Sequence, residues 1–340
     1  MESFDIDQAK DMLRRVLSVK TEGGTIIEFH GGEPFLSYLK IRELCEWAWK
    51  QDFPDEYRFF ATTNGTLIHG DIQNWLKRNH NRFVLALSMD GNREMQNINR
   101  SNSYDLIDFG FFVTTWPEQG VKMTISQYSI NQLADGVIHL HDLGFSDIAS
   151  NLAEMVDWSD PKYLKIFQRE LGKLTDYYLT HPTMNVCSLF DISFASVLST
   201  HHPKWCGCGS DMAEAIDIDG RRYPCHLFFP SVCGKEKADK VHLIDFSNPL
   251  SYLSKECIDC PALNICRTCY GSNYIVRGDI ALRDMNMCSY NKIRMAEIAR
   301  YKYCKIVNDD TDVTLLSDEE RMKRSLELEG IEKLAKFLSL

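Results

Sequence analysis

The sequence predicts an α/β fold in which a parallel sheet with helices on its outside is followed by a small cysteine-rich domain. Strand–loop–helix units recur roughly every 25–30 residues through the first 150 residues, which favours parallel pairing. The strands are apolar runs without clean alternation, which is typical of strands buried on both faces. Of the twelve cysteines, all but Cys45 lie at or after residue 187. This change in composition predicts a second domain.

The first half divides into elements that can be placed from periodicity and turn residues. Asn64-Gly65 and Asp90-Gly91 each end an apolar run and predict a turn there. The segment 103–117 is ambiguous between helix and strand. The helices expected are 5–18, 36–51, 71–79 and 130–143, and the strands expected are 25–29, 57–62, 83–88, 121–126 and 145–150.

Polar and glycine-rich loops follow these strands. In a parallel sheet such loops share one rim, at the carboxyl ends of the strands, where ligands bind. The loop Gly31-Gly32-Glu33-Pro34 is the most distinctive. Its glycines allow close approach of the backbone to a ligand, and its carboxylate suits an ammonium or hydroxyl group. The loops concerned are His30 to Pro34, Thr62 to Thr66, Ser88 to Gly91, Ser126-Gln127 and Asn151.

The second half begins with a long helix and then becomes rich in cysteine, glycine and short strands. Asp160 followed by Pro161 predicts the start of a helix over 160–182. Asp219-Gly220 predicts the turn of a hairpin. Ser317 with Glu320 predicts the cap of a helix over 317–339.

Composition excludes some classes of function. The chain has 340 residues and a net charge of −10, which argues against a nucleic-acid partner because phosphate binding needs a basic surface. No run of about 18 apolar residues occurs, so we expect no membrane span. The first residues do not resemble a signal peptide, so we expect a cytoplasmic protein.

The cysteine pattern indicates metal binding. Cys257 to Cys269 reads C-x2-C-x5-C-x2-C, which is too regular for chance packing of thiols. Such pairs suit tetrahedral zinc, and four thiolates also suit an iron–sulfur cluster. Spacing alone does not choose between them. Eight cysteines suffice for two four-thiolate sites: Cys206, Cys208, Cys225, Cys257, Cys260, Cys266, Cys269 and Cys288.

The motifs "FHGGEPFL", "TTNGTLI" and "LSMDG", followed by the cysteine-rich tail, resemble a radical SAM enzyme of the SPASM type. The resemblance implies a partial (β/α)6 barrel that binds a [4Fe–4S] cluster and S-adenosylmethionine, and a tail with two auxiliary [4Fe–4S] clusters. It predicts a barrel at 1–155, a helical linker at 156–200, the SPASM domain at 201–305 and a C-terminal helix at 306–340.

The resemblance also implies how the auxiliary clusters are held. Cys208 would be the fourth ligand of cluster I, with Cys187 as a rival, and Cys233 and Cys304 would be spare. The last spacing of the CxxC run is two residues where the family has three. The implied ligands are Cys206, Cys225, Cys269 and Cys208 for cluster I, and Cys257, Cys260, Cys266 and Cys288 for cluster II.

By the same resemblance, the rim loops would bind S-adenosylmethionine. The implied contacts are Gly31, Gly32 and Glu33 at its amino group, Thr63 and Asn64 beside them, and Ser88 and Asp90 at its ribose and carboxylate side.

One motif of the family is absent from the sequence. The radical chemistry needs a CxxxCxxC loop after the first barrel strand, upstream of GGEP, and no cysteine precedes Cys45. We therefore expect a barrel that lacks its first strand and a chain that does not cleave S-adenosylmethionine unaided. Three explanations stay open: a fragment whose missing loop is supplied by another polypeptide, a degenerate member of the family, or a misassigned start.

The substrate implied by the resemblance is a peptide or protein. Sulfatase-maturing relatives carry an aspartate as base directly after the cysteine at the position of Cys225, and here His226 stands there. This counts against formylglycine formation, and His226 is a candidate base because its pKa lies near neutrality. Two other interpretations remain: a non-catalytic [4Fe–4S] protein that binds a peptide or partner, and a zinc-binding module.

Overall fold

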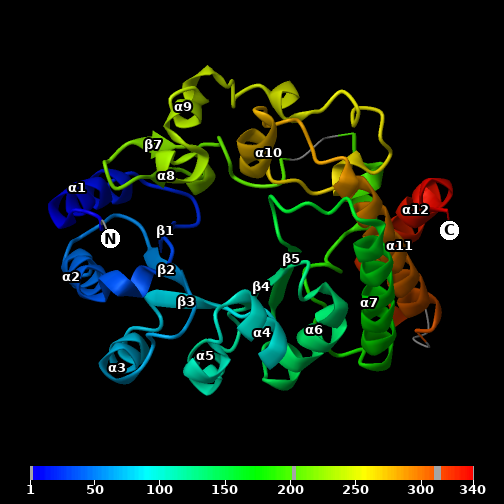
Figure 1. The fold of residues 1–340 in the computed structure, drawn as a ribbon, viewed down its shortest axis with the longest axis horizontal. Helices are drawn as coiled ribbons and strands as arrows, with labels where there is room; N and C mark the ends of the chain where they lie inside the picture. The colour runs from blue at the N-terminus through cyan, green and yellow to red at the C-terminus, as the bar shows by residue number, and fades with distance from the viewer. Residues whose placement is uncertain (1–2, 201–203, 310–314, 340) are drawn as a thin grey trace. The chain divides into compact units, whose positions relative to one another are not determined.

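The computed structural model describes residues 3–200, 204–309 and 315–339, and these form two compact units (Figure 1). The first unit comprises Met1–Ser129, Asp135–Asn151 and Ile216–Arg221, and the second comprises Ile130–Ala134, Leu152–Ala215 and Arg222–Leu340. The predicted start of the SPASM domain, residue 201, lies outside the described residues. The finer division into four parts stays a prediction.

The first unit is built on a five-stranded sheet in the order β1-β2-β3-β4-β5. Neighbours from β1 to β4 pair in parallel, with Phe29 opposite Ala61 and Thr63 opposite Leu87. The parallel order brings the loops after the strands to one edge. The strands are β1 (Thr25–Phe29), β2 (Tyr57–Thr63), β3 (Phe83–Ser88), β4 (Val121–Ile125) and β5 (Ile148–Leu152).

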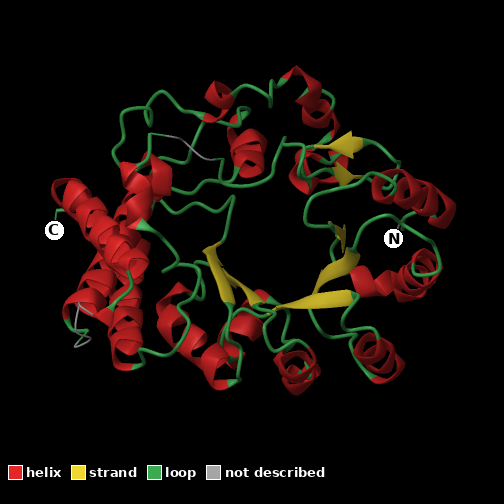
Figure 2. Ribbon diagram, turned by 180° about the vertical axis from the view of Figure 1, so that it is seen from behind, coloured by secondary structure: helices red, strands yellow, loops and turns green. Residues whose placement is uncertain are grey.

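The sheet is curved, and helices cover its convex face (Figure 2). Each crossover between parallel strands carries a helix, as a parallel sheet requires. The elements of this unit are α1 (Ile6–Leu17), η1 (Pro34–Ser37), α2 (Tyr38–Ala48), α3 (Gly70–Arg78), α4 (Arg93–Asn99), η2 (Tyr104–Leu106), α5 (Phe109–Thr115) and most of α6 (Leu133–Asp142), whereas η3 (Ile130–Gln132) belongs to the second unit.

The two faces of the sheet differ in chemistry. Phe59, Phe83 and Trp75 are almost completely buried under the helices, and Trp75 meets Phe83 edge to face with ring centroids 5.5 Å apart. On the opposite face Ile26 is 72% exposed. Glu28 and Lys122 are exposed on that face as well. The helical face therefore supplies the core, and the other face is left for polar side chains.

The second unit is organised by three long helices. Helices α7 and α11 pack against each other, and α12 packs on η4 and on α11. Buried Glu327 of α12 accepts hydrogen bonds from Ser193 and from the backbone of Phe194, and it pairs with Lys302 of α11 at 3.0 Å. These bonds join three elements of the unit. Their bounds are Pro161–Thr180 (α7), Phe194–Leu198 (η4), Asn286–Val307 (α11) and Asp318–Leu338 (α12).

Short elements carry the cysteine-rich part. A two-stranded sheet forms the predicted hairpin, in which Asp217 donates its N–H to the carbonyl of Arg221. The elements are β6 (Ala215–Ile216), β7 (Arg222–Tyr223), η5 (His226–Phe228), α8 (Pro230–Cys233), α9 (Lys235–Ala238), η6 (Val241–Leu243), η7 (Pro249–Tyr252), η8 (Leu263–Ile265) and α10 (Tyr270–Arg277).

The predicted α/β fold is confirmed: the sheet is parallel and curled, and the cysteine-rich region follows it. The ambiguous segment 103–117 is helical, since it forms η2 and α5. The sequence prediction missed α4 and the helix α11. Helix α11 mixes charged and aromatic residues around its whole circumference, so it shows little amphipathic periodicity.

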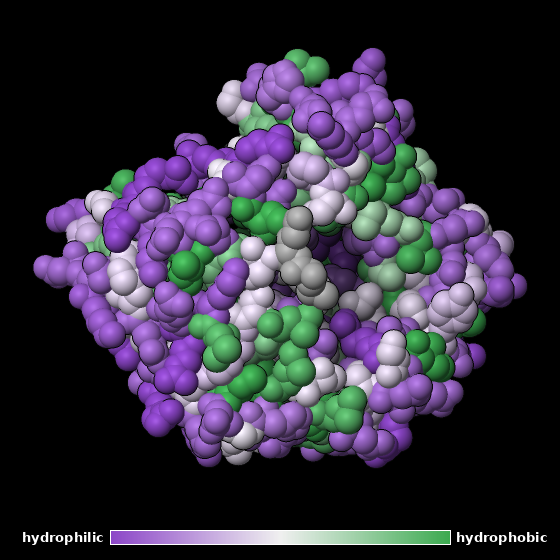
Figure 3. All heavy atoms as spheres, turned by 60° about the vertical axis from the view of Figure 1, so that its left-hand side comes forward, coloured by the Kyte–Doolittle hydropathy of each residue, from purple (hydrophilic) through white to green (hydrophobic). Residues whose placement is uncertain are grey.

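In the described part of the chain, no helix has both the length and the apolar character needed to cross a bilayer. On the face drawn in Figure 3, hydrophilic residues, coloured purple, surround smaller hydrophobic areas.

Candidate functional site

The loop after β1 is held by the carboxylate of Glu33. One oxygen, Oε1, accepts the N–H of Phe35 at 3.1 Å and the hydroxyl of Thr63 at 2.8 Å. The other, Oε2, accepts the N–H of Asn64 at 2.7 Å. Glu33 thereby caps η1 and ties the GGEP loop to the loop after β2. Three of its roughly four lone-pair sites are used within the protein.

Gly31 and Gly32 are the exposed part of the same loop. A Cβ built on either one would meet no atom within 4 Å. Their backbone groups are therefore reachable from outside, whereas the Glu33 carboxylate is largely committed. An ammonium group at this loop would meet backbone oxygens as readily as the Glu33 side chain.

The loop after β2 folds back on its own side chains. Thr63, which is 1% exposed, accepts the N–H of Gly65 at 3.1 Å. Asn64 accepts both the N–H and the hydroxyl of Thr66. Gly65 has a φ of +81°, and a Cβ there would lie 2.8 Å from the side chain of Leu87. The turn therefore needs glycine at this position.

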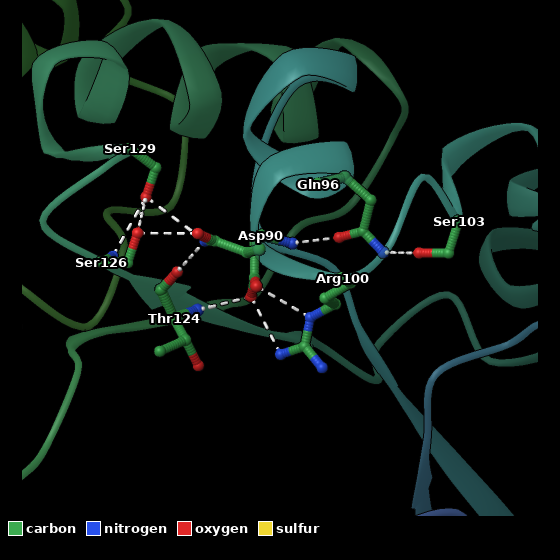
Figure 4. A network of polar contacts seen from close by, with 8 residues as sticks. Asp90, Gln96, Arg100, Ser103, Thr124, Ser126 and Ser129 are labelled. Carbon is green, nitrogen blue, oxygen red and sulfur yellow. Dashed lines mark hydrogen bonds and ion pairs between the residues drawn. The ribbon is translucent and has the colours of Figure 1, made fainter.

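The loop after β3 carries a buried carboxylate, Asp90, which pairs with the half-buried Arg100 at the end of α4. Asp90 is 2% exposed, and Arg100 binds both of its oxygens through Nε and Nη2, at 2.8 and 3.0 Å (Figure 4). Asp90 also accepts the N–H of Thr124 from β4 at 2.8 Å. A ligand would find this carboxylate already occupied. Ser88 precedes Asp90 by two residues; it is half-buried and is the last residue of β3.

Two amide side chains extend this network. Gln96 accepts the N–H of Asp90 and donates to Ser103. Asn99 accepts the hydroxyl of Ser126 at 2.7 Å and donates to the carbonyl of Thr124 at 3.1 Å. The network joins the loops after β3 and β4 into one rigid rim. Arg100, Gln96 and Asn99 were not predicted, because α4 was not predicted.

The open face of the sheet carries two charged residues, Glu28 and Lys122, that the sequence prediction missed. Lys122 donates to the hydroxyl of Thr62 at 2.7 Å and lies 4.0 Å from the carboxylate of Glu28. His30 lies 3.8 Å from the same carboxylate. A charged residue inside an apolar strand was the available signal, since Glu28 and Lys122 interrupt "TIIEF" and "VKMTI".

The first cysteine set consists of Cys206, Cys208, Cys225 and Cys269, all in the second unit. Hydrogen bonding with the Cys208 thiol lowers the pKa of Cys206 to about 6 and lowers the pKa of Cys225. The same bonds raise the pKa of Cys208. Burial raises the pKa of Cys269, and the Cys225 charge adds to this effect. The backbone N–H of Ser272, at the start of α10, donates to the Cys269 sulfur at 3.5 Å.

The second cysteine set consists of Cys257, Cys260, Cys266 and Cys288. Burial raises the pKa of Cys257 and of Cys266, and in both cases the charges of Cys260 and Cys288 add to the effect. Nearby arginines act in the opposite direction. The pKa values of several thiols in each set are thus affected by other thiols of the same set. That the two sets are the ligand groups implied by the family resemblance stays a prediction.

Two arginines beside the second cysteine set have buried N–H groups that find no partner among the described residues. They are the Nε of Arg283 and the Nε and Nη2 of Arg294. Arg283 donates another N–H to the carbonyl of Cys266 at 2.7 Å. Buried donors without acceptors are costly, so they suggest an anionic group that completes the site. The arginines lie outside the cysteine motifs, so spacing gave no hint of them.

The donor chemistry of each set, four thiols, suits a tetrahedral zinc or a four-thiolate iron–sulfur cluster. Within residues 3–200, 204–309 and 315–339, no three of His, Cys, Asp and Glu gather closely enough to hold a single metal ion. The buried arginine N–H groups at the second set are suited to an anionic group, such as the sulfides of a cluster.

The remaining predicted residues are placed as follows. His226 is half-buried and begins η5 directly after Cys225. Cys187 is fully buried, and its N–H donates to the hydroxyl of Tyr178 at 2.9 Å. In its thiolate form, Cys187 would raise the pKa of Arg294, which lies beside the second set. Cys233 donates weakly to the carbonyl of Phe228 at 3.4 Å, and Cys304 lies on α11.

Comparison with known sequences gives one group of relatives. No protein-family model matches the chain. Two cysteine-type anaerobic sulfatase-maturating enzymes, from two strains of Clostridium perfringens, are 36% identical over 103 residues. The match covers 29% of this chain and 27% of each relative. The chain thus matches about a quarter of the length of these curated relatives.

Solved structures match over most of the chain. A structure of anSMEcpe with bound AdoMet superposes with a TM-score of 0.65 and 19% identity, covering 91% of both chains. A second one contains bound AdoMet and a Cp18Cys peptide, with a TM-score of 0.64. SuiB of Streptococcus suis, bound to its precursor peptide SuiA, gives a TM-score of 0.53 and 18% identity over 84% of this chain and 70% of SuiB.

These findings agree with the resemblance inferred from the motifs. Over the 103 matched residues the chain is therefore homologous to the anaerobic sulfatase-maturating enzymes, and it has the fold of anSMEcpe, which confirms the predicted resemblance to this extent.

Proposed function

We propose that this chain is the major part of a radical SAM/SPASM oxidoreductase that modifies a peptide or protein. The observation that carries the proposal is the division of eight cysteines into two electrostatically interacting sets, with buried unpartnered arginine N–H groups at the second. In the proposal the two sets hold two auxiliary [4Fe–4S] clusters. Such clusters supply one-electron transfer when bound.

The rim of the sheet supplies the proposed S-adenosylmethionine site. Gly31 and Gly32 would offer backbone groups to its amino end, and Asn64 and Ser88 would contribute polar side-chain atoms. Glu33 and Thr63 would hold these loops in place through the hydrogen bond between them. Asp90 would act through Arg100 and Thr124, since its carboxylate is occupied.

Cleavage of S-adenosylmethionine needs a further part. The 340 residues contain no CxxxCxxC motif, and the Glu28, His30 and Lys122 side chains provide no thiolate. We propose that a polypeptide carrying that loop completes the reactive site. The absence of the motif favours one alternative, a non-catalytic iron–sulfur protein that binds a peptide or partner.

A peptide substrate is proposed because the solved neighbours include enzymes with bound peptides, namely anSMEcpe with Cp18Cys and SuiB with SuiA. His226, next to Cys225, is the candidate base in this chain. If His226 takes a proton during turnover, His226→Gln lowers kcat and leaves the iron content unchanged, because glutamine keeps polarity but not basicity.

The proposal is tested by anaerobic purification followed by metal analysis and turnover. We expect about eight irons per chain and broad absorption near 400 nm from thiolate-to-iron charge transfer. With a reductant, a peptide carrying the CxxxCxxC loop and S-adenosylmethionine, we expect 5′-deoxyadenosine. Colourless protein with two zincs would contradict the iron assignment. Iron-loaded protein without 5′-deoxyadenosine would favour the binding alternative.

A further inference from the structure

Arg294 is a cation buried without a counterion that bonds to it. It lies on α11, six residues after Cys288, and its side chain is 8% exposed. Neither Nε nor Nη2 has a hydrogen-bond partner in the described protein. Burial lowers the pKa of Arg294 to about 10, and the positive charge of Arg267 acts in the same direction.

The charged groups that face Arg294 do not neutralise it. Arg267 carries the same charge and lowers the Arg294 pKa further. Asp191 is 78% exposed and lies 3.4 Å from Arg267. The remaining groups are the thiols of Cys187 and Cys266, which stay uncharged unless they lose a proton. A buried guanidinium without an anionic partner is strongly destabilising, so a missing negative group is indicated.

Arg283 is in a similar situation and also lies close to Cys266. One of its N–H groups is fixed on the Cys266 carbonyl at 2.7 Å, and its buried Nε has no partner. Both arginines act on the pKa of the buried Cys266 thiol. Two cations therefore converge on one cysteine of the second set.

We propose that Arg294 and Arg283 donate N–H hydrogen bonds to the sulfurs of the cluster held by the second cysteine set and raise its reduction potential. This inference rests on the proposed function, in which that set holds a [4Fe–4S] cluster. Reduction adds negative charge to the cluster, and nearby cations and N–H donors favour the reduced state. The arginines would thus be positioning and tuning residues rather than ligands.

Among the residues that the structure describes, no arginine with an unpartnered buried N–H group lies at the first cysteine set. The largest effects on its thiols come from their own hydrogen bonds, from burial, from Ser272 and Glu154, and from Lys204. No arginine stands among them. The cluster of the second set should therefore have the higher potential of the two, which would direct an electron from the first set toward the second.

The test uses the full chain, reconstituted anaerobically with iron and sulfide and titrated by EPR at defined potentials. The variants are Arg294→Met, which keeps side-chain bulk without charge, and Arg294→Lys, which keeps charge but not the fork of donors. Arg300→Met is the matched control. Arg300 lies on the same helix but is paired with Asp176 and Glu297.

We expect Arg294→Met to lower one of the two midpoint potentials by a tenfold change in the reduced-to-oxidised ratio, about 59 mV for one electron. Arg294→Lys should fall between that variant and the parent, and Arg300→Met should match the parent. If Arg294→Met loses iron, Arg283→Met replaces it in the same titration, with the same sign expected.

Two results would overturn the inference, and they differ from each other. In the first, Arg294→Met and Arg283→Met bind the full amount of iron and both clusters keep the potentials of the parent protein. This result would rule out the tuning role and leave the proposed function intact. A parent protein that takes up zinc or no iron would remove the proposed function and the tuning role together.

Discussion

The rim of the parallel sheet and the cysteine-rich region differ in whether their buried polar groups have hydrogen-bond partners within the described protein. At the rim, protein groups satisfy one another: Glu33 uses both oxygens on neighbouring loops, and Asp90 binds Arg100 through two bonds. At the second cysteine set, buried N–H groups of Arg283 and Arg294 have no partner. The polar groups of the rim are satisfied within the protein, whereas in the proposed function a bound cluster would complete the cysteine-rich region.

This difference separates a scaffold from a site that depends on its cofactor. A self-satisfied rim should keep its geometry with or without ligand, because its hydrogen bonds are all internal. A cysteine set with raised thiol pKa values and unpaired cations should be stable only when metal turns the thiols into thiolates. The predictions below test this comparison, from the largest expected effect to the smallest.

The largest effect should follow the loss of one ligand from a cysteine set. Cys225→Ser and Cys266→Ser should each lower the iron content from about eight to about four per chain, because each removes one cluster and spares the other. Iron analysis and EPR measure this. Cys304→Ser is the matched control, since Cys304 belongs to neither set, and it should keep all of the iron. Loss of all iron in either variant would contradict two separate sets.

Replacement of Asp90 should weaken the sheet unit without affecting iron. Asp90→Asn removes the charge that Arg100 binds, leaves Arg100 without its partner, and weakens the bond from Thr124. We expect a loss of about 2–4 kcal/mol in the free energy of unfolding. Urea denaturation followed by tryptophan fluorescence measures it. Parent-like stability would show that the pair is not required for the rim.

Glu33→Gln should have a smaller effect. Glutamine keeps one acceptor oxygen, but its NH2 group faces a donor, either the hydroxyl of Thr63 or the N–H of Asn64. The expected loss is about 1–3 kcal/mol. A drop in S-adenosylmethionine affinity larger than the drop in stability, measured by calorimetry on folded protein, would instead show that the Glu33 carboxylate contacts the cofactor directly.

The sequence predicted the sheet well because its signals are local. Apolar runs bounded by Asn64-Gly65 and Asp90-Gly91 gave β1 to β4 within one or two residues, and the Ser317–Glu320 capping box is present at the start of α12. The strand expected at 145–150 begins later, at Ile148. Each of these elements is specified by residues a few positions apart.

Only those site residues that belong to a short sequence motif could be predicted from the sequence. The cysteine spacing and the GGEP loop pointed to the correct regions of the chain. Arg294 was beyond reach because its significance depends on burial against Cys266, which is 28 positions earlier in the sequence. Asp90 was identified as a site residue. Its ion pair with Arg100 could not be predicted, because Arg100 is positioned by helix α4, whose seven residues show no clear periodicity.

The smallest effect concerns pH and is confined to the sheet unit. Burial lowers the pKa of His139, which bonds to the hydroxyl of Tyr104, and burial lowers the pKa of His141. The unfolded chain therefore binds more protons than the folded one as pH falls below about 6.5, so stability is lost on acidification through that range.

Urea unfolding at pH 7.5 and 5.5 should show this loss, at most about 1.4 kcal/mol per pH unit for each histidine. His139→Gln with His141→Gln should flatten the dependence, whereas His80→Gln, an exposed control, should leave it unchanged. An unchanged slope in the double variant would assign the acid sensitivity to other groups.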